Sequence, residues 1–198
     1  MKADLNLQPL KTLKDNFLAT STQSMPLAGM IFWTAALVAG LYLTPQQHAF
    51  AVACGSGGIF PLAVVIERLR GRNFLAAGRD NPLTQMFMQS IVMVAILWPL
   101  VILGGVGKPV FVVLGAAILT GIVWIPYGWA ASDPVGMRHA IARVVLGYAA
   151  YLFAPRELVG SAICVSVLVC YGYSLAFMRR AEEGDARSVQ NAVQPANA

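Results

Sequence analysis

Long apolar segments constrain this chain more than any other feature. A helix needs about 20 predominantly apolar residues to cross the hydrocarbon core of a bilayer, and five segments meet that length without a charged residue. A sixth is equally long but contains Arg138, His139 and Arg143, and omitting it would leave the run VVLGYAAYLFA in water. The sequence therefore predicts six transmembrane helices, at residues 25–44, 47–66, 83–104, 109–130, 134–154 and 158–178.

Composition agrees with lipid as the solvent. Of the 198 residues, 58% are hydrophobic and 12% are charged, about half the charged fraction of a soluble domain. The net charge of +5 is modest, and no basic run is long enough to indicate a nucleic-acid partner. Cys54, Cys164 and Cys170 lie in apolar segments without the CxxC spacing of a metal or redox site, so we expect them to be packing residues.

The orientation follows from the positive-inside rule, which places Lys and Arg on the cytoplasmic side. Twelve of these residues fall on one predicted side, and only Lys108 and Arg156 on the other. We therefore expect an inner-membrane protein with both termini in the cytoplasm. Residues 1–24 lack the apolar core of a signal peptide; they form either a short interfacial helix, with Leu10, Leu13 and Phe17 on one face, or a solvated lead-in. The polar tail, 179–198, is expected to be disordered.

The connections on the outer side are short, so the six helices should form three antiparallel hairpins in an all-α membrane fold. Pro45, Pro99 and Pro155 stand near the three outer turns, with spacings of 54 and 56 residues. Either the hairpins are a diverged threefold repeat, or proline simply marks helix ends.

Short motifs resemble a known family. The segments GSGGIFPL (55–62), NPL (81–83), WPL (98–100) and IPYGW (125–129) are similar to an uncharacterised bacterial family of six-helix inner-membrane proteins. The hairpin pattern is more distantly similar to the acid-resistance membrane protein family. These resemblances imply a fold and a location, but no catalytic residues.

The second predicted span contains a weak point near its middle, at Gly55, Ser56, Gly57, Gly58 and then Pro61. Glycine and proline disfavour a helix by about 1 and 3 kcal/mol. Unwound backbone at membrane depth is tolerated only inside protein or along a cavity, and transporters use such breaks to bind substrates. The alternative is close helix packing with a proline kink.

The fifth predicted span places a charge inside the membrane. If the helix begins at Pro134, after the N-cap Asp133, Arg143 lies about 14 Å along it, and His139 lies one turn earlier on the same face. Such an arginine usually faces the bundle interior, although snorkelling to the head groups is the alternative. We predict that Arg143 faces the interior and contacts the second or third span, with Gln89 among its candidate partners.

Three functional classes follow. The first is a non-enzymatic accessory or stress-related membrane protein that acts through packing, homo-oligomers or partners in the bilayer. The second is a transporter or channel for a small anionic or zwitterionic solute. The third is a lipid-modifying membrane enzyme, for which Glu67 is the one evident base. The sequence predicts no metal site, cofactor or catalytic residue, and its candidate ligand-binding residues are Gly55, Ser56, Gly57, Gly58, Gln89, His139 and Arg143.

Overall fold

The computed structural model describes residues 9–20, 23–71 and 78–179, and over these residues the chain is helical, without strands. The predicted all-α class is therefore confirmed. The expected disordered tail, from 180 onward, lies outside the described residues, as does part of the lead-in. The helices are α1 (Leu10–Thr20), α2 (Ser24–Tyr42), α3 (Pro45–Ser56), α4 (Ile59–Leu69), α6 (Pro82–Gly104), α7 (Val110–Ile122), α8 (Trp124–Ala130), α9 (Pro134–Phe153) and α10 (Val159–Phe177).

The expected six spans are reproduced only in part. Among the described residues, four helical segments are long and apolar enough to cross a membrane: α2, α6, α7 with α8, and α10. The bent pair α3 with α4 makes up to five. The remaining candidate, α9, has the required length of 20 residues. Its mean hydropathy is lower than that of the other long helices, because it contains Arg138, His139 and Arg143, and it is not among the helices that are apolar enough to be identified as spans by composition.

The second predicted span, 47–66, is two helices rather than one. Helix α3 ends at Ser56, α4 begins at Ile59, and the two are bent by 50°. Gly58 donates to the carbonyl of Gly55, which closes a tighter turn than an α-helix has. Pro61 has no N–H for the carbonyl of Gly57. The predicted break is therefore present. Gly55 also packs closely against Phe32, as the alternative of close packing with a proline kink expected.

The fourth predicted span, 109–130, is also interrupted, at Val123 between α7 and α8. Pro126 explains the interruption, because it cannot donate a hydrogen bond to the carbonyl of Ile122. This break was not predicted from the sequence. Trp124 and Tyr127, which follow it, lie beside the interior residues described below.

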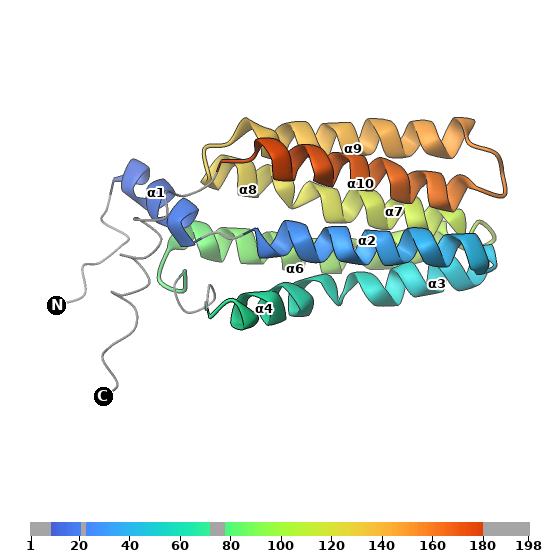
Figure 1. The fold of residues 1–198 in the computed structure, drawn as a ribbon, viewed down its shortest axis with the longest axis horizontal. Coiled ribbons are helices and arrows are strands. Elements are labelled where there is room, and N and C mark those ends of the chain that lie inside the picture. Colours follow the sequence, from blue (N-terminus) through green and yellow to red (C-terminus); the bar gives the residue numbers. More distant parts are fainter. Residues whose placement is uncertain (1–8, 21–22, 72–77, 180–198) are drawn as a thin grey trace.

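The long helices run alongside one another, with the α2–α3, α6–α7 and α9–α10 connections at one end of the bundle and α1 at the other (Figure 1). The connection between α2 and α3 is Leu43–Thr44, not Pro45–Gln46 as expected. Thr44 caps α3 in a capping box with Gln47, and Pro45 is the first helical residue.

The three outer prolines do not occupy one equivalent position. Pro45 begins α3, Pro99 lies inside α6, and Pro155 lies in the connection between α9 and α10. In these helices proline therefore serves three different local purposes, and its spacing gives no support to a threefold repeat.

Helix α9 is held in the bundle by backbone contact with α8. A Cβ added to Gly136 would lie 2.3 Å from the carbonyl oxygen of Trp124, and one added to Gly128 would lie 2.8 Å from the Cα of Gly136. Only residues without a side chain permit this approach. Asp133 caps α9 through the N–H of Val135, at 2.9 Å. These contacts set the register of α9, and with it the depth of Arg143.

Helix α1 packs against the end of the bundle. Leu13 and Phe17 are buried with Leu83, Ala130 and Ala131, while Leu10 is 51% exposed. Asn81 caps α6 and also donates to the carbonyl of Leu13, at 2.9 Å. Residues 10–20 thus form a helix, and most of its apolar face contacts protein.

The outer surface of the bundle is apolar. Large hydrophobic side chains are exposed along the long helices, among them Phe50, Ile96, Leu100, Val145 and Phe153. A soluble monomer rarely exposes so large a contiguous apolar surface. This pattern is typical of helices that face lipid.

Candidate functional site

Arg143 lies in the interior of the bundle and has no exposed surface. Helix α9 carries it inward on the face that also holds His139 and Gly147, which are buried as well. On the facing helix, Gly121 leaves room for it, because a Cβ there would lie 2.8 Å from the Cδ of Arg143. The interior position predicted for Arg143 is confirmed, and snorkelling is the wrong alternative.

The guanidinium has two polar partners and two aromatic ones. Its Nη2 donates to the hydroxyl of Thr120 at 2.8 Å, and its Nη1 lies 3.3 Å from Nε2 of His139. The ring centroids of Trp33 and Tyr171 lie 5.3 and 5.1 Å from its central carbon. These partners come from α2, α7, α9 and α10. None of these partners lies in α3, α4 or α6, so the predicted contact with the second or third span is wrong.

Arg143 determines which ring nitrogen of His139 carries the proton. A guanidinium can only donate hydrogen bonds, so Nε2 of His139 must accept and Nδ1 must carry the proton. Nδ1 then donates to the hydroxyl of Ser174 at 2.7 Å. The imidazole is also stacked on Trp124, with 4.0 Å between ring centroids. His139 is thus a neutral positioning group between α9 and α10.

The positive charge of Arg143 is not matched by a carboxylate. Among the described residues its contacts are hydroxyl, imidazole and aromatic faces, and its Nε has no hydrogen-bond partner. Cation–π contacts of a desolvated guanidinium contribute about 2 kcal/mol. They partly offset the cost of burying the charge, which amounts to several kcal/mol.

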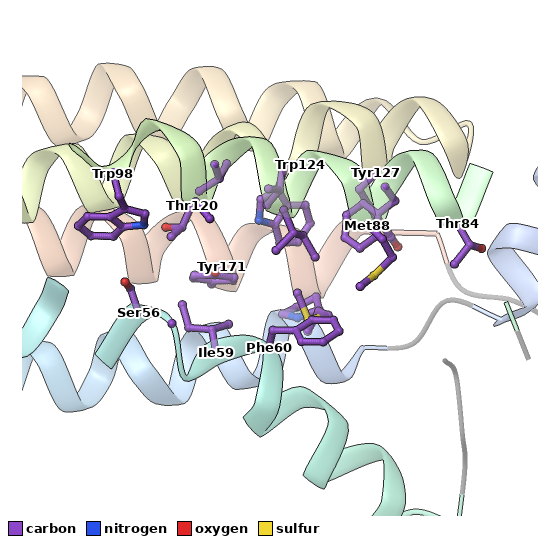
Figure 2. Close-up of a pocket in the computed structure, with 18 of the residues that line it drawn as sticks. Ser56, Ile59, Phe60, Thr84, Met88, Trp98, Thr120, Trp124, Tyr127 and Tyr171 are labelled. Atoms are coloured by element: carbon purple, nitrogen blue, oxygen red, sulfur yellow. The ribbon is translucent and has the colours of Figure 1, made fainter. Parts of the chain in front are cut away.

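A cavity of about 200 Å³ lies beside this cluster. Its walls come from the α3–α4 junction, from one face of α6, from α7 and α8, and from α10 (Figure 2). The start of α2 and the residues Phe17 and Thr20 of α1 also line it. Most of the lining is apolar. The polar side chains in it are the hydroxyls of Thr20, Ser56, Thr84, Thr120, Tyr127 and Tyr171 and the indoles of Trp98 and Trp124.

Three residues belong to both the cavity and the arginine cluster. Thr120, Trp124 and Tyr171 line the cavity on one side (Figure 2) and contact Arg143 or His139 on the other. They form a wall that separates the charge from the cavity. None of the three was predicted from the sequence; the spacing of Thr120 and Trp124, four residues apart in one apolar segment, was the available indication.

The structure separates the candidate ligand-binding residues into groups. Ser56 and Gly57 line the cavity, whereas Gly55 packs against Phe32. His139 and Arg143 lie together behind the wall. The side chain of Gln89 is exposed, and neither it nor Gly58 lines the cavity.

Glu67, the candidate base, is 1% exposed. It accepts a hydrogen bond from Ser24, which fastens α4 to the start of α2. It does not line the cavity. Within the residues described, no group of three or more His, Cys, Asp or Glu side chains could hold a metal ion.

Comparison with known families gives one match, which covers residues 11–180 and therefore α1 through α10. The chain belongs to a family of unknown function, DUF7010. This agrees with the expected membership of an uncharacterised family. No curated protein and no solved structure matches the chain. Because the DUF7010 match includes both the cavity and the arginine cluster, both belong to the family's domain and not to an appended segment.

Proposed function

We propose that the chain is an integral inner-membrane protein that acts as a non-enzymatic accessory or stress-related factor, through its packing and its partners in the bilayer. In this proposal α9 is a sixth transmembrane span, and three antiparallel hairpins place both termini in the cytoplasm. The excess of Lys and Arg at the α1 end supports the orientation.

One observation carries the functional proposal: Arg143 is enclosed. Its guanidinium is enclosed by Thr120, His139 and the faces of Trp33 and Tyr171. The neighbouring cavity is apolar. A carrier of a polar solute needs polar groups that the solute can reach. The enclosure therefore favours a structural role for the arginine.

Flux measurements test this proposal. Protein reconstituted into vesicles should give no flux above empty vesicles for small anions and zwitterions such as chloride, phosphate and amino acids. Arg143→Leu should lower thermal stability without changing flux. Flux of any of these solutes that requires Arg143 would overturn the proposal.

The second candidate is transport, and the interruption between α3 and α4 is the observation that favours it. Ser56 and Gly57 border the cavity at a 50° bend, which is how broken helices present backbone dipoles to a substrate. Gly57→Ala tests this candidate cleanly, because the nearest atom to the added Cβ is the carbonyl oxygen of Cys54, at 3.8 Å. Loss of flux in this well-folded variant would favour transport.

The burial of Glu67 supports a non-enzymatic role over a lipid-modifying enzyme, because a base for lipid chemistry has to be reachable from the bilayer. Homo-oligomers remain part of the proposal. Cross-linking of the protein in native membranes would test them.

A further inference from the structure

The cavity is elongated along α6. Its α6 wall is one face of that helix, with residues spaced three or four apart: Thr84, Phe87, Met88, Ile91, Val94, Ala95 and Trp98. From Thr84 to Trp98 is about 21 Å along a helix. A volume of about 200 Å³ is below the roughly 300–1,000 Å³ of sites for drug-sized ligands. A long and narrow cavity of this size suits a chain better than a compact molecule.

Three of the lining hydroxyls are occupied by the protein itself, and that of Thr20 donates to the carbonyls of Asn16 and Phe17. Ser56 donates to the carbonyl of Ala53 at 3.0 Å, and Thr120 donates to the carbonyl of Ala116 at 2.8 Å while accepting from Arg143. The middle of the cavity therefore offers few partners to water, and apolar cavities of this kind stay dry. Left empty, the lining would lose its dispersion contacts. An apolar occupant restores them.

The cavity opens sideways, at the depth of the hydrocarbon core. Gly57, at the α3–α4 break, and Ala95, on α6, both line the cavity and are both exposed. They lie about 18 and 20 Å from the first residues of their helices, Pro45 and Pro82. In a core about 30 Å thick, these positions face acyl chains and not head groups.

The packing of the helices explains this opening. Helix α4 packs mainly against α2, and α6 packs against α7 and α8. The bend after Ser56 directs α4 away from the cavity lining, as Figure 2 shows for the segment beyond Phe60. The break therefore leaves a slot between the two helices that is continuous with the lipid-facing surface.

We infer that this cavity binds one acyl chain of a membrane phospholipid, which enters from the bilayer between α4 and α6. The chain lies along α6 with its methyl end toward Trp98. Its ester end lies at Thr84, whose buried hydroxyl has no partner within the protein and donates to the ester carbonyl. The lipid comes from the leaflet at the α1 end, where Phe17 and Thr20 close the cavity.

Quenching by brominated lipid tests this inference, because the chain has two buried tryptophans in different places. Trp124 lines the cavity and is 6% exposed, whereas Trp33 is fully buried and does not line it. Proteins that retain only one of them, with the other tryptophans changed to phenylalanine, are reconstituted in phosphatidylcholine brominated along its acyl chains. We expect quenching of Trp124 to exceed that of Trp33 several-fold. Equal, weak quenching would overturn the inference.

A matched pair of variants tests whether the quenching of Trp124 depends on the cavity. Ala95→Phe places a ring in the cavity and should return Trp124 quenching to the level of Trp33. Val92→Phe adds a ring to the same helix at an exposed position outside the cavity and should leave quenching unchanged. If both variants behave alike, Trp124 reports on the bilayer and not on the cavity, and the inference is wrong.

Native mass spectrometry supplies a measurement that needs no tryptophan changes. The wild-type protein and Val92→Phe should retain one phospholipid after extensive detergent washing, and Ala95→Phe should retain none. Thr84→Val, which preserves side-chain shape, should retain less lipid because the ester carbonyl loses its donor. Retention of free fatty acid in place of phospholipid, or equal retention by wild type and Ala95→Phe, would contradict the inference.

Discussion

The Nη2 of Arg143 donates a 2.8 Å hydrogen bond to the hydroxyl of Thr120, and that hydroxyl also borders the cavity. This hydrogen bond therefore connects the charged residue of α9 to the cavity lining on α7. Because no carboxylate of the described chain contacts Arg143, its environment depends on the shape of the guanidinium and on the aromatic faces around it.

Arg143→Lys should destabilise the protein. An ammonium on a flexible stem cannot donate to Thr120 and His139 in the same plane or lie over two aromatic faces as a guanidinium does. The loss of one charge-assisted hydrogen bond corresponds to about 1.5–3 kcal/mol. Thermal unfolding in detergent measures the effect. An Arg143→Leu variant that is more stable than the wild type would show that the arginine has no structural role.

Gly121→Ala should lower stability by displacing the arginine. The added Cβ would lie 2.8 Å from the Cδ of Arg143, closer than such atoms approach. Gly172→Ala is the control, since a Cβ there has no neighbour within 4 Å and alanine favours a helix by about 1 kcal/mol. We expect the unfolding temperature to fall for the first and to stay level or rise for the second. A similar response from both would contradict the packing at Gly121.

Ser174→Ala should lower stability by about 0.5–1.5 kcal/mol, because it removes the hydroxyl that accepts from the buried Nδ1–H of His139. Ser166→Ala, on the same helix, is the matched control. The Ser166 hydroxyl is also buried but bonds only the carbonyl of Ile163 in its own helix, so its removal leaves no side chain unpaired. Equal destabilisation of the two variants would show that His139 does not depend on Ser174.

Accessibility labelling should establish the topology. In a Cys54→Ala background, Gln46→Cys should react with an impermeant thiol reagent added outside intact cells. Asp80→Cys should react only after the membrane is permeabilised, and a reporter fused after Met178 should be active in the cytoplasm. The expectation rests on the Lys and Arg asymmetry. An external reporter would reverse the orientation and would also remove the argument for an even number of spans.

The sequence by itself determined the features that depend on local composition. Apolar length predicted an all-helical chain and the positions of its long helices. The Asp133–Pro134 start set the register of α9, and glycines with Pro61 predicted the break between α3 and α4, because these are backbone effects of neighbouring residues. The interior position of Arg143 was also predictable, since a charge at that depth has few other stable locations.

Tertiary structure decided which residues meet. Arg143 contacts Thr120, Trp33 and Tyr171, which are 23 to more than 100 positions away in the chain. The periodicity of apolar residues within each helix does not determine which helices are neighbours in the bundle. The order follows from close approaches such as that of Gly128 to Gly136. The lateral cavity likewise depends on the direction that α4 takes after its bend. For these physical reasons the sequence could place a charge in the interior, but only the packed bundle shows that the charge is enclosed and that the cavity beside it is apolar.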